Sequence, residues 1–231
     1  MTDKYDQIIS ERIRRSNYAS KERYVFGGEV FVFVKDPLPK NFNLDFVLKK
    51  LQDIIPPHLI FDLDAIYIGN FDFLDDREYT ATYKEGAIYV TNKQDNEKDM
   101  IQDFIHETSH MIEETNAADI YNDKSLENEF LKKRRSLSSL LGSEGIRAPA
   151  LLMRQPEFNP HLDQFFVKKV GYPLLTTLIN GIFNSPYAVT SLREYFARGF
   201  EEFIMGDKYY LQKISPVLYS KLEELVYPDE V

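Results

Sequence analysis

Two of the four histidines in the chain fall within one five-residue pattern. Residues 106–110, HETSH, have the form H-E-x-x-H. Side chains four residues apart project from the same side of a helix, so the imidazoles of His106 and His110 can bind one Zn²⁺. Glu107 lies one step round the helix, where its carboxylate can take a proton from a water on that metal. We therefore expect one Zn²⁺ per chain, with Glu107 as the general base.

A catalytic zinc needs a third protein ligand and leaves its fourth position to water. The chain has no Cys, so this ligand must be His or a carboxylate. Glu194 is the first choice because it points away from the apolar stripe of its own amphipathic segment. An ion pair with Arg198, four residues on, is the alternative role for Glu194. The remaining candidates are Glu113, Glu114, His161 and Asp163.

The H-E-x-x-H pattern lies in the strongest predicted helix of the chain, at 94–114. Apolar positions recur there with helical spacing: Ile101, Phe104, Ile105, Thr108, Met111 and Ile112. On a helical wheel both His106 and His110 lie opposite this stripe. We therefore do not expect them to be ordinary buried histidines.

The region before this helix is typical of a small sheet with one backing helix. Strands are predicted at 29–35, 64–71, 78–84 and 87–92, and a helix capped by Asn43 at 44–55. Glu85-Gly86 separates the last two strands and is a two-residue hairpin signal. The fold class is therefore α+β, with a small mixed sheet, a backing helix, the H-E-x-x-H helix and a mainly helical C-terminal part.

The predicted elements divide the chain into three parts. Residues 1–28 form a helical arm, 29–115 the sheet with the H-E-x-x-H helix, and 116–231 a helical subdomain that carries Glu194. Helices are predicted in this last part at 124–141, 161–184 (one helix, or two broken at Gly171 and Pro173), 187–205 and 214–227, with a long loop at 142–160.

The charge balance argues against nucleic acid as a partner. The net charge is −9 and the pI is about 5.1, whereas a duplex-DNA binder normally has a basic surplus. The one basic run, 132–135, could meet phosphate, but beside acidic neighbours we expect a solvated helix face. No segment approaches the roughly 20 apolar residues of a membrane span, and the N-terminus lacks the apolar core of a secretory signal. We expect a cytoplasmic or particle-associated protein that does not bind membranes.

These motifs resemble the peptidase domain of the anthrax lethal factor-like group, to which the Pro-Pro endopeptidases belong. The resemblance covers roughly residues 60–205 and rests on H-E-x-x-H and on EYFARGF at 194–200, with Tyr187 seven residues before Glu194. The downstream signature of the group is similar to E-[F/Y]-F-A-E-x-F. Arg198 therefore stands where the group has a second Glu, and 84 positions separate His110 from Glu194, more than is usual for the group.

The resemblance implies a zincin-like fold and a zinc-dependent metalloendopeptidase. The implied zinc ligands are His106, His110 and Glu194. Glu107 would be the general base, and Tyr187 would donate its phenol to the oxyanion of the tetrahedral intermediate. A peptide or protein substrate would lie along the outer strand, at 78–84.

Two other functions stay open at the level of sequence. A regulatory metallopeptidase of the kind that cleaves phage repressors shares H-E-x-x-H and the missing signal peptide, although the Tyr187–Glu194 pair argues against it. A non-enzymatic structural or assembly protein with an inactive zincin fold is favoured by Arg198 and by the long insertion at 115–185. The sequence predicts neither the substrate nor the oligomeric state.

Overall fold

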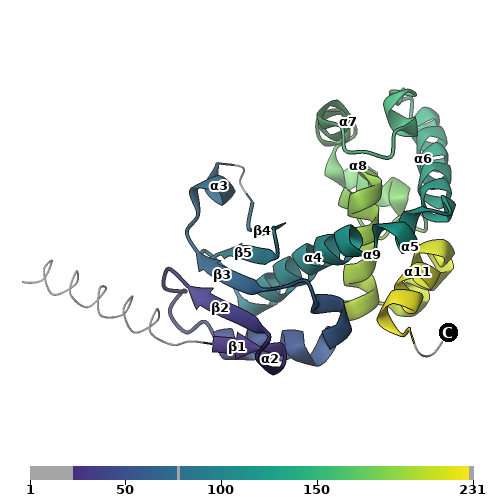
Figure 1. Ribbon diagram of the computed structural model, residues 1–231. Helices are drawn as coiled ribbons and strands as arrows, with labels where there is room; N and C mark the ends of the chain where they lie inside the picture. The colour runs from purple at the N-terminus through teal and green to yellow at the C-terminus, as the bar shows by residue number, and fades with distance from the viewer. Residues whose placement is uncertain (1–22, 77–78, 229–231) are drawn as a thin grey trace, which may run out of the picture. The chain divides into compact units, whose positions relative to one another are not determined.

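The computed structural model describes residues 23–76 and 79–228 (Figure 1). The chain divides into two compact units at residues 111 and 112, inside helix α4 (Glu97–Thr115). The predicted boundary, between residues 115 and 116, is four residues later, at the end of that helix. Most of the predicted arm at 1–28 lies outside the described residues. Its described part, 23–28, consists of strand β1 (Arg23–Val25) and a 3₁₀ turn rather than a helix.

The first unit contains a mixed five-stranded sheet with the order β1-β2-β3-β5-β4. The strands after β1 are β2 (Val30–Val34), β3 (Ala65–Gly69), β4 (Ala81–Lys84) and β5 (Ala87–Thr91). Strands β2, β3 and β5 run parallel, and β1 and β4 are antiparallel edge strands. The four predicted strands are confirmed, and β4 lies at the outer edge as expected. Strand β1 was missed because it is only three residues long and lies in a charged segment.

Local sequence accounts for two features of this unit, the hairpin between β4 and β5 and the start of the backing helix. Glu85 and Gly86 have φ values of 49° and 78°, the left-handed conformation that a type I′ hairpin requires, and they join β4 to β5. The Asn43 side chain accepts a hydrogen bond of 3.0 Å from the Phe46 N–H and caps helix α2 (Leu44–Ile54). Both features were predicted from the residue types alone.

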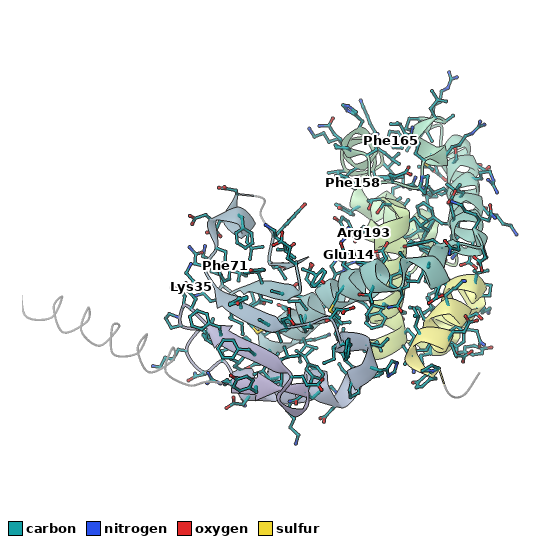
Figure 2. The ribbon with its side chains drawn as sticks, viewed as in Figure 1. Lys35, Phe71, Glu114, Phe158, Phe165 and Arg193 are labelled. Carbon is teal, nitrogen blue, oxygen red and sulfur yellow. The ribbon has the colours of Figure 1, made fainter. Side chains whose placement is uncertain are left out.

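The two faces of the sheet differ in chemistry. One face is aliphatic and almost fully buried: Val32, Val34, Ile66, Ile68, Ile88 and Val90. The other carries a row of seven rings whose neighbouring centroids are 5.1–6.4 Å apart: Tyr24, Phe31, Phe33, Tyr67, Tyr89, Phe71 and Phe73. Lys35 lies over the Phe71 ring at 4.8 Å (Figure 2). These rings are half-buried or exposed, so only the aliphatic face contributes to the core.

The second unit is helical. Its α-helices after the end of α4 are α5 (Ala117–Tyr121), α6 (Ser125–Ser143), α7 (Pro160–Phe165), α8 (Tyr172–Ile179), α9 (Leu192–Met205), α10 (Lys208–Ile214) and α11 (Pro216–Val226). Helix α7 continues as a π-helical turn to Val170, and the chain breaks at Gly171, where φ is 79°. The two-helix alternative for 161–184 is therefore confirmed. Among the described residues, no helix has the length and apolar character needed to cross a membrane.

The basic run of α6 is only in part the solvated face that we predicted: Lys132 and Arg135 are exposed, whereas the two residues between them are buried. Arg134 is 0% exposed and Lys133 is 7% exposed. The Lys133 ammonium donates to the Ile182 carbonyl at 2.5 Å and to the Ser215 hydroxyl at 2.7 Å. The Arg134 guanidinium donates only to backbone carbonyls. Both cations can be buried because their donors are satisfied by oxygen atoms within the protein.

The free energy of unfolding should depend on pH through Lys133. Burial lowers the pKa of Lys133 to about 8, against about 10.4 for an ordinary lysine. Between these values the unfolded chain binds more protons than the folded chain, so this group makes stability rise with pH from about 8 to about 10.5. Below about pH 8 the lysine is protonated in both states, and its contribution to stability no longer changes with pH. The rise should be on the order of 2 kcal/mol, and K133M should abolish it. Urea unfolding of both proteins between pH 7 and 10 measures this difference, and parallel pH dependences would contradict it.

Candidate metal centre

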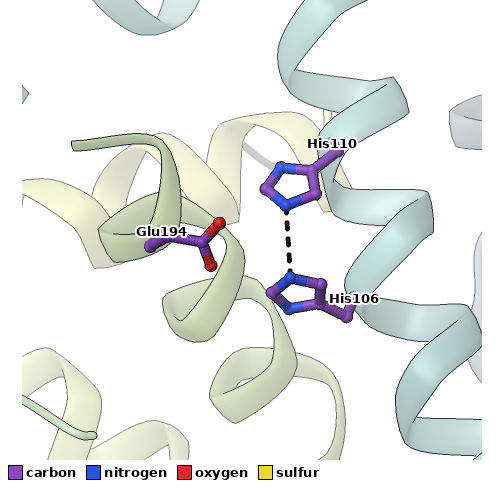
Figure 3. A group of neighbouring side chains, drawn as sticks. All are labelled: His106, His110 and Glu194. Atoms are coloured by element: carbon purple, nitrogen blue, oxygen red, sulfur yellow. Dashed lines mark hydrogen bonds between the residues drawn. The ribbon is translucent and has the colours of Figure 1, made fainter. Parts of the chain in front are cut away.

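Helix α4 carries the H-E-x-x-H residues in its second half. The Nε2 atoms of His106 and His110 are 3.2 Å apart, and the two rings meet edge to face with centroids 4.7 Å apart (Figure 3). The apolar residues of the predicted stripe are buried, which confirms the face of the helix that meets the core. The four-residue spacing therefore brings the two imidazoles together on one side of α4.

The environment of His110 differs from the expectation. Its side chain is buried, with 6% exposure, although the helical wheel placed it opposite the core. Its chain neighbours Ser109 and Met111 are also buried, so α4 is covered on more than one side. A wheel with one apolar stripe does not represent such a helix. His110 is thus on a covered surface of α4, whereas His106 is half-buried.

Glu107 lies at the free edge of the sheet. Its Oε2 atom accepts a hydrogen bond of 2.6 Å from the backbone N–H of Tyr83, in edge strand β4. This N–H does not take part in the ladder between β4 and β5, since it donates to the carboxylate. The proposed base is therefore adjacent to the strand along which we expect the substrate to bind.

Asp103, one turn before His106, fixes α4 to the β4–β5 region. Its two carboxylate oxygens accept hydrogen bonds of 3.0 Å from the Thr80 hydroxyl and the Gln94 amide. Burial raises the pKa of Asp103, and these two hydrogen bonds oppose that shift. Asp103 had no predicted role, and its spacing from His106 was the only signal for it in the sequence.

Glu194 lies in the first turn of α9, and Ser191 caps that helix. The Ser191 hydroxyl accepts a hydrogen bond of 3.1 Å from the Glu194 N–H. The predicted helix at 187–205 therefore begins at Leu192, because the extended backbone of Ser191 interrupts it. Tyr187 is not on this helix. It opens a separate 3₁₀ turn, η5 (Tyr187–Val189), and is half-buried.

The three predicted ligands form one group (Figure 3). The ligand atoms of His106, His110 and Glu194 all lie within 4.8 Å of one another. Two imidazole nitrogens and a carboxylate oxygen are a donor set suited to a catalytic zinc with an open fourth position. The residues present therefore fit a divalent cation. Within residues 23–76 and 79–228, this is the one group of three His or acidic side chains close enough to hold a metal ion.

The other ligand candidates are not in this group. Glu113 accepts a hydrogen bond of 2.5 Å from the Tyr121 hydroxyl and lies 3.7 Å from the Arg193 guanidinium (Arg193 is labelled in Figure 2). Burial beside Glu113 raises the pKa of Tyr121. Within the second unit, the last turn of α4 therefore contacts the residue that precedes Glu194. His161 is exposed at the start of α7.

Arg198 forms an ion pair with Glu201. The alternative role for Glu194 was an ion pair with Arg198, and Arg198 takes Glu201 as its partner instead. Its Nη1 atom lies 2.9 Å from the carboxylate of Glu201, which is 7% exposed. Its guanidinium also lies over the Tyr187 ring, 5.4 Å from the centroid. The residue that departs from the signature of the lethal factor-like group therefore packs against Tyr187.

Comparisons with known proteins give no assignment for this chain. No family model, no curated protein and no solved structure matches it. The functional conclusion therefore depends on the residues themselves: two imidazoles on α4, a carboxylate on α9 and a second carboxylate at the sheet edge.

Proposed function

We propose that this protein is a zinc-dependent metalloendopeptidase with a zincin-like fold, of the kind found in the lethal factor-like group. The observation that carries the proposal is the close grouping of the ligand atoms of His106, His110 and Glu194. The mixed sheet, with an antiparallel edge strand beside the H-E-x-x-H helix, supports it. The fold alone does not define the activity, so the residues of the site must supply it.

The chemistry follows from the residues around that group. Zinc bound there would act as a Lewis acid for the scissile carbonyl and the attacking water. Glu107 takes a proton from the water as its oxygen bonds to the carbonyl carbon. The Tyr187 hydroxyl donates a hydrogen bond to the oxyanion that forms. Glu107 then delivers the proton to the leaving nitrogen as the C–N bond breaks, which gives a carboxylate and an amine.

An extended peptide is the substrate that this arrangement suits. Strand β4 is an edge strand, and backbone groups on its free side can pair with an added strand. The Tyr83 N–H on that side contacts Glu107 at 2.6 Å. A peptide added along β4 would therefore lie next to the general base, which supports the substrate position expected at 78–84.

Metal removal tests the proposed activity. We expect the purified protein to hold one zinc per chain and to cleave members of a peptide library. Chelation should lower cleavage by more than about a hundredfold, and one equivalent of zinc should restore it, because the metal activates both water and carbonyl. Elemental analysis and mass spectrometry of the library measure the two quantities.

The control for this test is a variant without the histidine pair. H106A/H110A, treated in the same way, should neither bind zinc tightly nor recover activity. Stoichiometric zinc in the wild type without cleavage of any peptide would contradict the enzymatic proposal. It would favour a structural or assembly protein with an inactive zincin fold.

A further inference from the structure

Arg134, buried in α6, connects two distant stretches of the second unit. Its Nε donates to the Val189 carbonyl at 2.8 Å, and Nη2 donates to the Thr190 carbonyl at 2.6 Å. Nη1 donates to the carbonyls of Gln155 at 2.5 Å and Leu152 at 3.5 Å. One side chain thus fixes the backbone at 152–155 and at 189–190.

The turn that Arg134 holds leads directly to Glu194. Thr190 immediately precedes Ser191, the cap of α9, and Ser191 accepts the hydrogen bond from the Glu194 N–H. Val189 and Thr190 are themselves buried, with 0% and 4% exposure. Short polar contacts and one capping residue therefore connect the guanidinium to the backbone of Glu194.

The second stretch reaches α9 by another route. The Leu192 N–H, at the first position of α9, donates to the Pro156 carbonyl at 2.7 Å. Pro156 directly follows Gln155, whose carbonyl accepts from Arg134. The first turn of α9 is therefore supported from both sides by backbone segments that share the same guanidinium.

We propose that Arg134 is a positioning residue for the metal centre, which fixes the first turn of α9 so that the Glu194 carboxylate is held for the cation. This inference rests on the metal centre proposed above. A guanidinium suits the task because its planar fork donates in several fixed directions, whereas a lysine ammonium donates from a single point. Partners that orient a ligand typically change metal affinity 10- to 100-fold when they are removed.

Lys133 provides a matched control within the same helix. It is also buried, but its ammonium donates to Ile182 and Ser215, neither of which belongs to the two stretches held by Arg134. Its ammonium also lies over the ring of Tyr195, the residue after Glu194, 5.0 Å from the centroid. Methionine keeps an apolar side chain against that ring, so K133M should alter stability with little effect on the position of Glu194. R134K keeps a positive charge in the buried position, which limits the loss of stability.

The test is zinc affinity, measured by competition with a chromophoric chelator in the full-length protein. We expect R134K to weaken zinc binding by about 10- to 100-fold and K133M by less than about threefold. In the E194A background, R134K should cause no further loss, because the ligand that Arg134 positions is already absent. Circular dichroism and Tm of the metal-free proteins establish that each variant is folded.

Three results would overturn the inference. The first is a zinc affinity of R134K equal to that of the wild type. The second is a loss of zinc affinity from R134K that is equally large in the wild-type and E194A backgrounds. Unchanged affinity in E194A would refute the proposed third ligand together with this role for Arg134. A loss in E194A with none in R134K refutes Arg134 alone. Should R134K fail to fold, S191A removes the cap at the other end of the same contacts, and unchanged affinity there would overturn the proposal.

Discussion

E107Q is expected to lower peptide hydrolysis by about a thousandfold and to leave zinc affinity within about threefold of wild type, since a positioned general base contributes roughly 10²–10⁴-fold. Glu107 is not among the three grouped ligands, so its replacement should spare the metal. Glutamine matches glutamate in size, and its carbonyl oxygen can still accept the Tyr83 N–H. What it cannot do is take a proton from water at neutral pH.

The comparison requires kcat/KM for a cleaved peptide and zinc affinity in the same preparation. E114Q is the matched control because Glu114 lies on the same helix and is exposed. Activity of E107Q within tenfold of wild type would show that the base is another group. Loss of zinc in E107Q would instead indicate that Glu107 maintains the geometry of the site.

E194A should weaken zinc binding by more than about a hundredfold, beyond the 10- to 100-fold that residues supporting a ligand usually contribute. Removal of one of the three proposed ligands would leave only the histidine pair of α4. Glu194 is half-buried in the first turn of α9, and only its backbone N–H takes part in the cap, so the Ala variant should retain helix α9. Cleavage should fall with the loss of bound metal.

H161A serves as the control for this variant, because His161 was a candidate ligand that is exposed and lies outside the group. It should bind zinc like the wild type. Calorimetric or chelator-competition measurements at matched pH give both affinities. Unchanged binding in E194A, or a comparable loss in H161A, would remove Glu194 from the metal centre.

The elements that sequence analysis predicted best are specified by neighbouring residues. Asn43 caps α2 through Phe46, three residues away, and Glu85-Gly86 forms a hairpin from its own backbone angles. The start of α9 was misjudged because the capping role of Ser191 was overlooked within a continuous amphipathic pattern. Strand β1 was missed because its pairing with β2 carries no signal in three residues.

In the candidate site too, features that depend on neighbouring residues were predicted and features that depend on distant residues were not. The pairing of His106 and His110 is a local property of a helix, so the spacing predicts it. Contacts between distant segments had no such signal. The Glu107–Tyr83 hydrogen bond depends on how a helix lies against a sheet edge. The burial of Arg134 depends on carbonyls 55 and 56 positions further along the chain.

The proposed third ligand follows the second histidine by 84 positions, and this separation has a thermodynamic consequence. Only the native conformation offers all three donors at once, so the cation would bind folded molecules in strong preference to unfolded ones. A ligand of this kind stabilises the native state by mass action, by about 2.7 kcal/mol when its free concentration is a hundred times Kd. Metal supply would therefore govern what fraction of the molecules is folded, in addition to the proposed chemistry.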